Sequence, residues 1–455
     1  MMRTLAGFAE ACGGRLQGED RSFSQVSTDT RTLERGELFV ALRGPRFNGN
    51  EYVPQAHAAG AAGAVVDAPQ VTPLAQVIVA ESQAALARAA QHWRGRFDIP
   101  VIGVAGSNGK TSTKEMTAAI LARSGACLAT RGNLNNHIGV PLTLLRLASE
   151  HRSAVIEMGA NQSGDVAALV ELAAPTNGHI TNPGAEHLEG FGTLEAAARA
   201  EGEMVEGLPA AGTAVINADD PYAPMWRGLT RARVVSFGMS PNAAWRAEGV
   251  HFEVDVQGFR TRFTLVSPLG CAAVMLELAG RHNVMNALGA AAAAAAAGAS
   301  LEHIIAGLGA VRAVPGRLQF KRSLSGAWLI DDSYNANPSS VRAGIEVLAQ
   351  LDGSKWLVLG DMAELGEFAE ESHAEIGAFA RAHGVERLFA TGTLTRGAVQ
   401  SFGAGGEWFA DAPALAAALI ASANAGVRML VKGSRMNRLE RVVEALTAPA
   451  QERAK

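Results

Sequence analysis

The sequence predicts a multidomain α/β protein built on parallel sheets. The chain has 455 residues, more than one ordinary hydrophobic core supports. Short apolar segments alternate with helical patterns and end in polar residues, as in repeated βα units. From Val101 to Glu115, a glycine-rich turn joins an apolar segment to a helical one. We expect a small α/β domain at residues 1–82, a central P-loop domain with a parallel sheet at 83–314, and a Rossmann-like domain at 315–455.

The glycine-rich turn is the strongest indication of function. It consists of Gly106, Ser107, Asn108, Gly109, Lys110 and Thr111, with Ser112 following. Such a turn between strand and helix can wrap backbone N–H groups around phosphates, while the lysine neutralises charge and the threonine hydroxyl ligates Mg²⁺. Val104 stands where the full motif has its first glycine, so this is a shortened G-x-x-G-K-T. The simpler alternative is a tight strand–helix turn with a surface lysine.

Composition excludes several other classes. The net charge of −4 gives no electrostatic basis for binding nucleic acid or an anionic membrane. The longest apolar stretch, Ala290–Ala297, is too short and too weakly hydrophobic to span a bilayer. The N-terminal residues lack the apolar region and cleavage site of a secretion signal. Cys12, Cys127 and Cys271 are too scattered for a disulfide framework or metal cluster, and we expect buried thiols in a cytoplasmic protein.

In the first unit, a polar cluster at 27–31 precedes a predicted strand at 36–42, and a loop follows at 43–50. We expect a helix at 57–63 and strands at 64–66 and 77–79.

In the central unit, we expect helices at 82–93, 111–124, 193–206 and 284–297, and a β-meander at 230–280. The strand 154–157 ends on Glu157. Ligands of parallel sheets lie at the carboxyl ends of strands, so this carboxylate is placed to hold Mg²⁺ directly or through water. The alternative is a solvated strand-end glutamate. His187, in a loop, is a candidate second metal ligand or an ordinary surface histidine. Asn283 and Asn286 share a helix face and could bond an adenine edge.

Pro315-Gly316 marks the boundary of the third unit. We expect a strand from Trp328 that ends on acidic residues, a helix at 341–351, and strands at 355–359, 387–391 and 428–432. The absence of G-x-G-x-x-G makes a dinucleotide cofactor an unfavoured interpretation.

Several segments together resemble the Mur ligases of peptidoglycan (cell wall) synthesis. They are GSNGKTSTKE, GNLNNHIGVPLTLL, AVIEMGAN, AEHLEGFG, GRHNVMNA, PGR, DDSYNANP, LGDMAELG and KGSR. The resemblance extends from about Ser27 to Arg435. DDSYNANP, LGDMAELG and HLEGFG point to the branch that adds D-alanyl-D-alanine.

The resemblance implies a UDP-sugar-binding first domain, a central ATPase domain and a Rossmann-like third domain. It also implies a cytoplasmic ligase that uses ATP and Mg²⁺ to phosphorylate the C-terminal carboxylate of UDP-MurNAc-tripeptide. The amine of D-Ala-D-Ala then attacks the acyl phosphate. Positioning and charge neutralisation dominate phosphoryl transfer. Neither a nucleic-acid partner nor stable membrane insertion is expected, and we expect a monomer whose domains close for chemistry.

Carried over position by position, the resemblance assigns roles to particular residues. Catalysis is assigned to Lys110, Glu157, His187, Glu201 and Arg317. ATP is assigned to residues 106–112, Asn283, Asn286, Arg317, Asp332 and Tyr334, with His282 in support. Mg²⁺ is assigned to Thr111, Glu157, His187 and Glu201. Substrates are assigned to Ser27, Asp29, Thr30, Arg31, Arg46, Asn48, Asn135, Asn136, Asn335, Asp361, Lys432 and Arg435.

One departure has a chemical consequence. The family usually carries a lysine, in a K-x-K-G-E run, that CO₂ carbamylates so that it presents a carboxylate to the second Mg²⁺. Here the run is Arg199-Ala200-Glu201-Gly202-Glu203. We hypothesise that Glu201 replaces the carbamate directly or through water. Asn48 and Asn50 also depart from the usual Asp and His, which leaves the uridine contacts open.

Three alternatives remain. The ligase one step earlier typically carries a D-N-P-R motif, which this chain lacks. Folylpolyglutamate synthetase is a relative, but the first domain and DDSYNANP argue against it. A nucleotide-binding scaffold with an inactive P-loop is the alternative from a different class. The sequence leaves open whether the third residue of the tripeptide is diaminopimelate or lysine.

Overall fold

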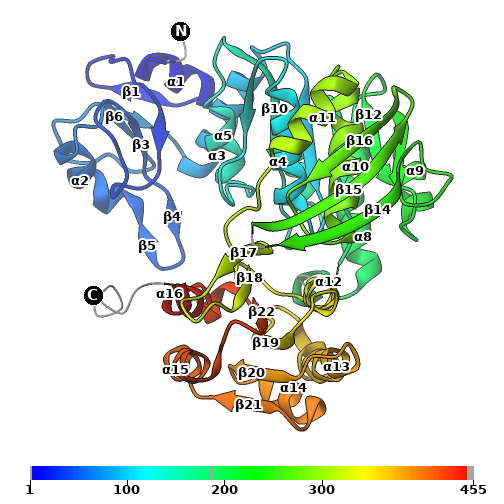
Figure 1. Ribbon diagram of the computed structural model, residues 1–455. Helices are drawn as coiled ribbons and strands as arrows, with labels where there is room; N and C mark the ends of the chain where they lie inside the picture. The colour runs from blue at the N-terminus through cyan, green and yellow to red at the C-terminus, as the bar shows by residue number, and fades with distance from the viewer. Residues whose placement is uncertain (1–2, 185–187, 256, 448–455) are drawn as a thin grey trace.

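The computed structural model describes residues 3–184, 188–255 and 257–447. Figure 1 shows three α/β bodies in chain order, from blue through green to red, each built around its own sheet. The expected α/β class is confirmed. Within the described residues no helix combines the length and apolar character needed to cross a bilayer.

The first body has a five-stranded sheet in the order β1-β7-β6-β3-β2, in which β1 is antiparallel and the other pairings are parallel. Its elements are α1 (Leu5–Cys12), β1 (Arg15–Gln17), β2 (Val26–Ser27), β3 (Leu38–Val40), β4 (Arg43–Gly44), β5 (Phe47–Asn48), the 3₁₀ helix η1 (Gly49–Tyr52), α2 (Val53–Ala58), β6 (Gly63–Val66) and β7 (Gln76–Ile78).

The expected bounds of the helix at 57–63 are wrong, because the helix lies earlier in the chain. The helix α2 spans Val53–Ala58, because Pro54 favours a helix start and Gly60, at φ +85°, lies just beyond its end.

The expectation that all three thiols are buried is also corrected. Cys12 is buried and Cys127 is partly buried, but Cys271 lies exposed on an outer strand.

The central body has a nine-stranded sheet in the order β16-β15-β14-β13-β12-β11-β8-β10-β9. The strands from β9 to β14 pair in parallel, and β14, β15 and β16 form an antiparallel meander that is shorter than the one expected at 230–280, because β13 in that range pairs in parallel. The strands are β8 (Val101–Ala105), β9 (Ala126–Ala129), β10 (His151–Glu157), β11 (Asn177–Ile180), β12 (Thr213–Asn217), β13 (Arg233–Gly238), β14 (Trp245–Asp255), β15 (Gly258–Ser267) and β16 (Gly270–Leu276). The helices are α3 (Ser82–Arg94), α4 (Lys110–Leu121), α5 (Gly139–Leu144), α6 (Asp165–Ala173), α7 (Leu188–Phe191), α8 (Leu194–Glu206), α9 (Ala223–Leu229), α10 (Arg281–Ala296) and α11 (Leu301–Ala310).

Small residues bring the central helices close together. In α10 the run from Ala290 to Ala294 is almost completely buried, so this alanine-rich helix packs closely against its neighbours. A Cβ added at Gly307 of α11 would lie 2.4 Å from the Cα atom of Ile120 in α4. The face of the central sheet that α4, α10 and α11 cover forms one core. The opposite face shares a second core with α1 of the first body.

The third body has a six-stranded sheet in the order β17-β18-β22-β19-β20-β21, with β17 antiparallel and the other strands parallel. The strands are β17 (Gln319–Arg322), β18 (Trp328–Asp332), β19 (Ser354–Gly360), β20 (Arg387–Thr391), β21 (Gly406–Phe409) and β22 (Val427–Lys432). The helices are α12 (Pro338–Ala349), η2 (Gly366–Phe368), α13 (Ala369–Ala382), α14 (Thr395–Phe402), α15 (Ala412–Ser422), η3 (Arg435–Asn437) and α16 (Glu440–Thr447).

The close approach of α11 to α4 makes a testable prediction. We expect Gly307→Ala to lower the free energy of unfolding by about 1–3 kcal/mol, because the new methyl group meets backbone atoms that cannot move aside cheaply. The matched control is Gly309→Ala in the same helix, where the nearest atom is 3.8 Å away. That substitution should stabilise by about 0.4–1 kcal/mol. Calorimetric melting temperatures check both, and equal shifts would contradict the packing argument.

Candidate active site

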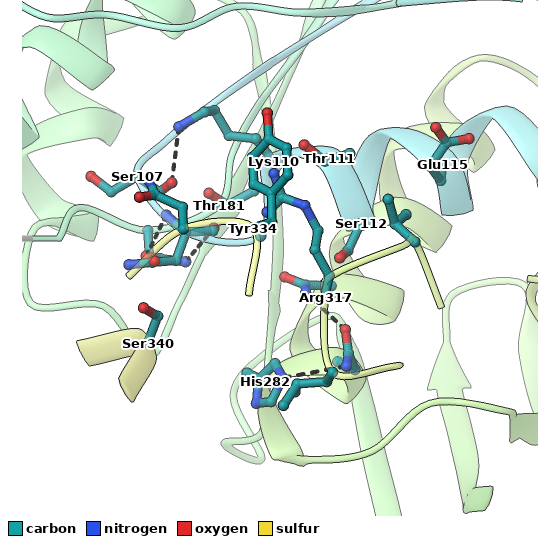
Figure 2. A pocket seen from close by; sticks show the side chains of 18 of the residues that line it. Ser107, Lys110, Thr111, Ser112, Glu115, Thr181, His282, Arg317, Tyr334 and Ser340 are labelled. Carbon is teal, nitrogen blue, oxygen red and sulfur yellow. Dashed lines mark hydrogen bonds between the residues drawn. The ribbon is translucent and has the colours of Figure 1, made fainter. Parts of the chain in front are cut away.

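A cavity of about 550 Å³ lies between the carboxyl ends of the central strands and the third body. It is lined by the glycine-rich turn, by α10, by the connecting segment 311–318 and by the start of α12. Figure 2 shows Lys110 and Thr111 at one wall, with Arg317 and Tyr334 from the third body beside them. The strand β8, which leads into the turn, lies between β10 and β11, where the chain order across the sheet changes direction. In open α/β sheets ligands bind at such a point.

The turn after β8 requires glycine at two positions. Gly106 has φ +120° and Gly109 has φ +83°. A Cβ at Gly106 would lie 2.1 Å from Oγ1 of Thr181, and one at Gly109 would lie 2.4 Å from Oδ1 of Asn286. The two glycines therefore allow the loop backbone to touch both the end of β11 and the helix α10.

Lys110 begins α4 and folds back along the loop. Its Nζ donates to the Ser107 carbonyl at 2.9 Å and also to the Gly106 carbonyl. The ammonium group therefore lies at the mouth of the loop, beside the N-terminus of a 12-residue helix. Both features favour an anionic ligand at this position.

Glu157 is buried rather than solvated, with 2% of its surface exposed. Its Oε1 accepts hydrogen bonds from Asn135 Nδ2 at 2.8 Å and Thr111 Oγ1 at 3.3 Å. Its Oε2 is buried and has no hydrogen-bond partner among the described residues. An orphaned carboxylate oxygen beside a threonine hydroxyl is a donor set that suits a hard cation such as Mg²⁺. The described residues contain no cluster of three or more His, Cys, Asp or Glu side chains arranged for a metal.

The other two predicted metal ligands are His187 and Glu201. His187 lies outside the described residues. Glu201, on α8, is 4% exposed, and its Oε2 accepts the Gly106 N–H at 2.6 Å. The carboxylate therefore anchors the first residue of the glycine-rich turn, a contact that spacing in the sequence does not predict.

The predicted adenine-binding asparagines do share one face of α10. Asn286 donates to Oδ1 of Asn283 at 3.3 Å, and Asn283 donates to the Ala279 carbonyl at 2.7 Å. The neighbouring His282 lines the cavity, and burial together with the charge of Lys432 lowers the pKa of its imidazole to about 4. His282 is therefore neutral at physiological pH.

The third body supplies a second wall. The Arg317 guanidinium lies 4.4 Å from the centre of the Tyr334 ring. Arg435, which is not among the lining residues, lies 5.7 Å from the centre of the same ring. Lys432 Nζ donates to Oδ2 of Asp332 at 2.6 Å and to the Asn335 carbonyl at 2.9 Å. This buried ion pair holds the end of β18 against the end of β22 beside the cavity.

Several predicted substrate residues lie away from this cavity. Ser27, Asp29, Thr30, Arg31, Arg46 and Asn48 belong to the first body and are not among its lining residues. Asp29 pairs with Arg31 at 2.6 Å on the surface, and hydrogen bonds from Arg31 lower the pKa of Asp29 to about 2. Asn48 Oδ1 accepts from the backbone and side chain of Asn50, whose amide also donates to Asp67 at 2.6 Å.

Two further predicted residues have structural contacts. Asp361 does not line the cavity, because its carboxylate accepts the N–H groups of residues 393, 394 and 395 at the start of α14. Asn136 lines the cavity but uses its Oδ1 to accept the N–H groups of Ile138 and Gly139 at the start of α5. The placement of both side chains is thus explained by a helix start that each one caps, which is local for Asn136 and distant in sequence for Asp361.

Some lining residues were not predicted from the sequence. They include His179, Thr181, Asn182, Asn217, Asn337 and Ser339. The pair Asn337-Pro338 carries a helix-start signal that could have drawn attention to the N-terminus of α12. His179 gave no such signal, because it lies inside a short buried strand and only the fold brings it beneath the cavity.

The chain resembles known proteins over almost its whole length. Residues 22–102 match the Mur ligase family catalytic domain, 104–294 the Mur ligase middle domain, and 316–435 the Mur ligase glutamate ligase domain. The UDP-N-acetylmuramoyl-tripeptide–D-alanyl-D-alanine ligase of Escherichia coli K12 is 44% identical over 97% of this chain and 98% of its own.

Solved structures agree with these matches. A crystal structure of MurF from Acinetobacter baumannii superposes with a TM-score of 0.89 at 33% identity, covering 96% of this chain and 97% of that one. MurF from Thermotoga maritima in complex with ADP superposes with a TM-score of 0.81 at 26% identity, covering 93% and 96%.

His179 makes the acid stability of the site testable. Its ring is completely buried, neither nitrogen has a partner among the described residues, and burial lowers its pKa from 6.5 to about 3. The unfolded chain therefore binds a proton more readily, so this histidine costs stability as the pH falls below about 6.5.

We expect His179→Leu to gain about 2 kcal/mol more unfolding free energy at pH 5 than at pH 8. The substitution also changes the packing around residue 179, but this effect on the unfolding free energy is the same at both pH values and cancels in the difference. The exposed His251→Leu serves as control, with melting temperature as the readout. A gain that is the same at both pH values would contradict the burial argument.

Proposed function

Because the chain belongs to the Mur ligase family, we propose that it is an ATP-dependent ligase that adds D-alanyl-D-alanine to UDP-N-acetylmuramoyl-tripeptide. The observation that carries this proposal is the 44% identity to the Escherichia coli ligase of that name over nearly the whole of both chains. The product would be the UDP-linked pentapeptide used in peptidoglycan synthesis. We also propose that the enzyme acts in the cytoplasm as a monomer.

The proposed reaction has two steps. An oxygen of the tripeptide's terminal carboxylate attacks the γ-phosphorus of ATP, and ADP leaves with the bridging oxygen. The amine of D-Ala-D-Ala then attacks the carbon of the acyl phosphate, forms the amide bond and releases phosphate and a proton. Positioning and charge neutralisation dominate the first step. The N–H groups at the N-terminus of α4 and the ammonium of Lys110 are suited to both tasks, whereas the N–H groups of residues 106–108 already donate within the protein.

We propose that Thr111 and Glu157 hold Mg²⁺, with His187 and Glu201 as further candidates. The orphaned Oε2 of Glu157 beside the Thr111 hydroxyl supports this assignment. When bound, the cation neutralises phosphate charge. Arg317 and Tyr334 would then enclose the nucleotide from the third body, and Asn283 and Asn286 would face its base.

The proposal extends to the division of labour among the domains. Residues 1–82 would bind the UDP-sugar, 83–314 ATP, and 315–455 the incoming dipeptide. In the first domain we assign Ser27, Asp29, Thr30, Arg31, Arg46 and Asn48 to the uridine diphosphate. Asn135, Asn136, Asn335, Asp361, Lys432 and Arg435 remain proposed substrate residues; for Asn135, Asn136 and Asp361 the side-chain contacts described above favour a positioning role.

The function is tested by omitting one substrate at a time. With Mg²⁺, ATP, UDP-MurNAc-tripeptide and D-Ala-D-Ala all present, we expect ADP release and a pentapeptide product by mass spectrometry. Omission of any component should abolish the product. Lys110→Ala should lower kcat about 100-fold or more, which excludes a contaminating ATPase. ADP release that needs a different acceptor amine would point to another Mur ligase, and ATP binding without turnover would favour the scaffold.

Glu201 makes a second prediction. We propose that its negative charge replaces the carbamate of the usual lysine, so wild-type activity should not respond to bicarbonate. Glu201→Gln keeps an oxygen to accept the Gly106 N–H but removes the charge. We therefore expect it to lose at least about tenfold in kcat. Glu195→Gln, at an exposed position in the first turn of α8, should retain full activity.

The reverse substitution sharpens this test. Glu201→Lys should be nearly inactive without CO₂ and regain activity with bicarbonate. It should also show a ¹³C carbamate resonance when ¹³C-bicarbonate is supplied. Strong bicarbonate activation of the wild type, or full activity in Glu201→Ala, would refute the replacement. Near-wild-type activity in Glu201→Gln would restrict Glu201 to anchoring the loop.

A further inference from the structure

The side chain of Asn108 points away from the phosphate-binding turn and towards the third body. Its Nδ2 donates to Ser339 Oγ at 3.1 Å, and its Oδ1 accepts from Asn337 Nδ2 at 2.8 Å. Ser339 Oγ in turn donates to Asn337 Oδ1 at 3.0 Å. The three side chains therefore form a closed hydrogen-bonded ring between residues more than 200 positions apart in the chain. We call these three residues the Asn108 ring.

The orientation of the ring follows from the capping of α12. Asn337 is the N-cap of this helix, is 3% exposed, and uses Oδ1 to accept the Ser340 N–H at 2.8 Å. A backbone N–H can only donate, so this bond fixes which end of the Asn337 amide carries oxygen. The Nδ2 group must then face Asn108. The third body thus presents to the turn a hydrogen-bond donor, Nδ2 of Asn337, whose orientation is already fixed.

The other side of Asn108 is held by the central sheet. Its backbone N–H donates to Oδ1 of Asn182 at 3.3 Å, and its carbonyl accepts from Nδ2 of the same residue at 2.9 Å. Asn182 is the second residue after the end of β11. Asn108 therefore joins the end of a central strand, through its own backbone, to the first turn of α12.

A second contact between the two bodies is of a different kind. Phe259 of β15 packs edge to face on Phe320 of β17, with ring centres 5.8 Å apart. This apolar contact lies in a core shared by the two bodies, beside the segment that connects them. Apolar contacts tolerate small rotations, whereas a hydrogen-bonded ring is sensitive to both distance and angle. The apolar contact therefore suits a pivot about which the bodies can rotate. The Asn108 ring suits a latch that holds them at one distance and angle.

We propose that Asn108 is a positioning residue that latches the third body onto the phosphate-binding turn. The latch would set the distance between Lys110 on the turn and the third-body pair Asp332–Lys432, which line the same cavity. A change in the turn at residues 107–108 would be transmitted directly to α12. The expected effect on kcat rests on the proposed ligase function, whereas the expected effect on the distance between the two bodies does not.

The geometric test measures the distance between the two bodies. Spin labels would be placed on Cys271, which is exposed, and on Gln400→Cys in α14, in a Cys127→Ser background. With Mg²⁺ and a non-hydrolysable ATP analogue, the parent protein should give one narrow distance distribution. Asn108→Ala and Ser339→Ala should each broaden it towards longer distances. Unchanged distributions in both variants would overturn the latch.

Ser340→Ala is the matched control. It removes the Ser340 hydroxyl from the same capping box but retains the backbone N–H that orients Asn337. Its distance distribution should match that of the parent. If Ser340→Ala opens the bodies as much as Ser339→Ala does, helix capping explains the effect and the latch is wrong.

The kinetic test is a double-mutant cycle. We expect Asn108→Ala and Ser339→Ala each to lower kcat about two- to tenfold, and the double variant to be no worse than Asn108→Ala alone. Ser339→Ala should change kcat more than the KM for ATP. Additive losses would overturn the coupling. If the parent fails to ligate, the proposed function falls, while the distance measurement still decides the latch.

Discussion

The site depends on one steric constraint, the absence of side chains at Gly106 and Gly109. Both residues have positive φ, and both bring loop backbone against neighbours where a Cβ atom would overlap Thr181 or Asn286. The strand β8, the end of β11, and the helices α8 and α10 meet at this one turn because it is so thin. The Gly106 N–H reaches the Glu201 carboxylate at 2.6 Å for the same reason. A bulkier turn would separate the walls of the cavity.

The buried acids around this turn differ in how they are neutralised. Asp332 has a lysine 2.6 Å away, so its charge is balanced within the protein. Among the described residues, the side-chain donors to Glu157 are the neutral Asn135 and Thr111, and both bond to the same oxygen. Burial of a carboxylate costs free energy unless a cation compensates it. The two acids therefore differ in charge balance: Asp332 is already paired within the third body, and the unpaired Glu157 supports the proposal that it binds a cation.

Sequence patterns anticipated the local parts of this arrangement and missed the long-range ones. The strand, turn and helix from Val101 onwards could be predicted because glycine placement and apolar spacing act within a few residues. The shared face of Asn283 and Asn286 follows from helical periodicity in the same way. The ring of Asn108, Asn337 and Ser339 could not be predicted, since it depends on how two bodies dock. Asp361 shows the converse case, in which a motif residue is engaged by backbone N–H groups of a distant helix.

The balance of charge in the cavity explains why carboxylates are found where a triphosphate would bind. Among its described lining residues, the acids are Glu115, Glu157 and Asp332, and the bases are Lys110, Arg312, Arg317 and Lys432. Lys432 is paired with Asp332, and Arg312 lies 2.9 Å from Glu277. Only Lys110 and Arg317 then remain, in this lining set, to meet the several negative charges of a nucleotide. Such a ligand would be repelled by Glu157, and by Glu201 behind the turn, unless divalent cations entered with it. The two buried acids therefore support the proposal that a nucleotide and divalent cations bind here together.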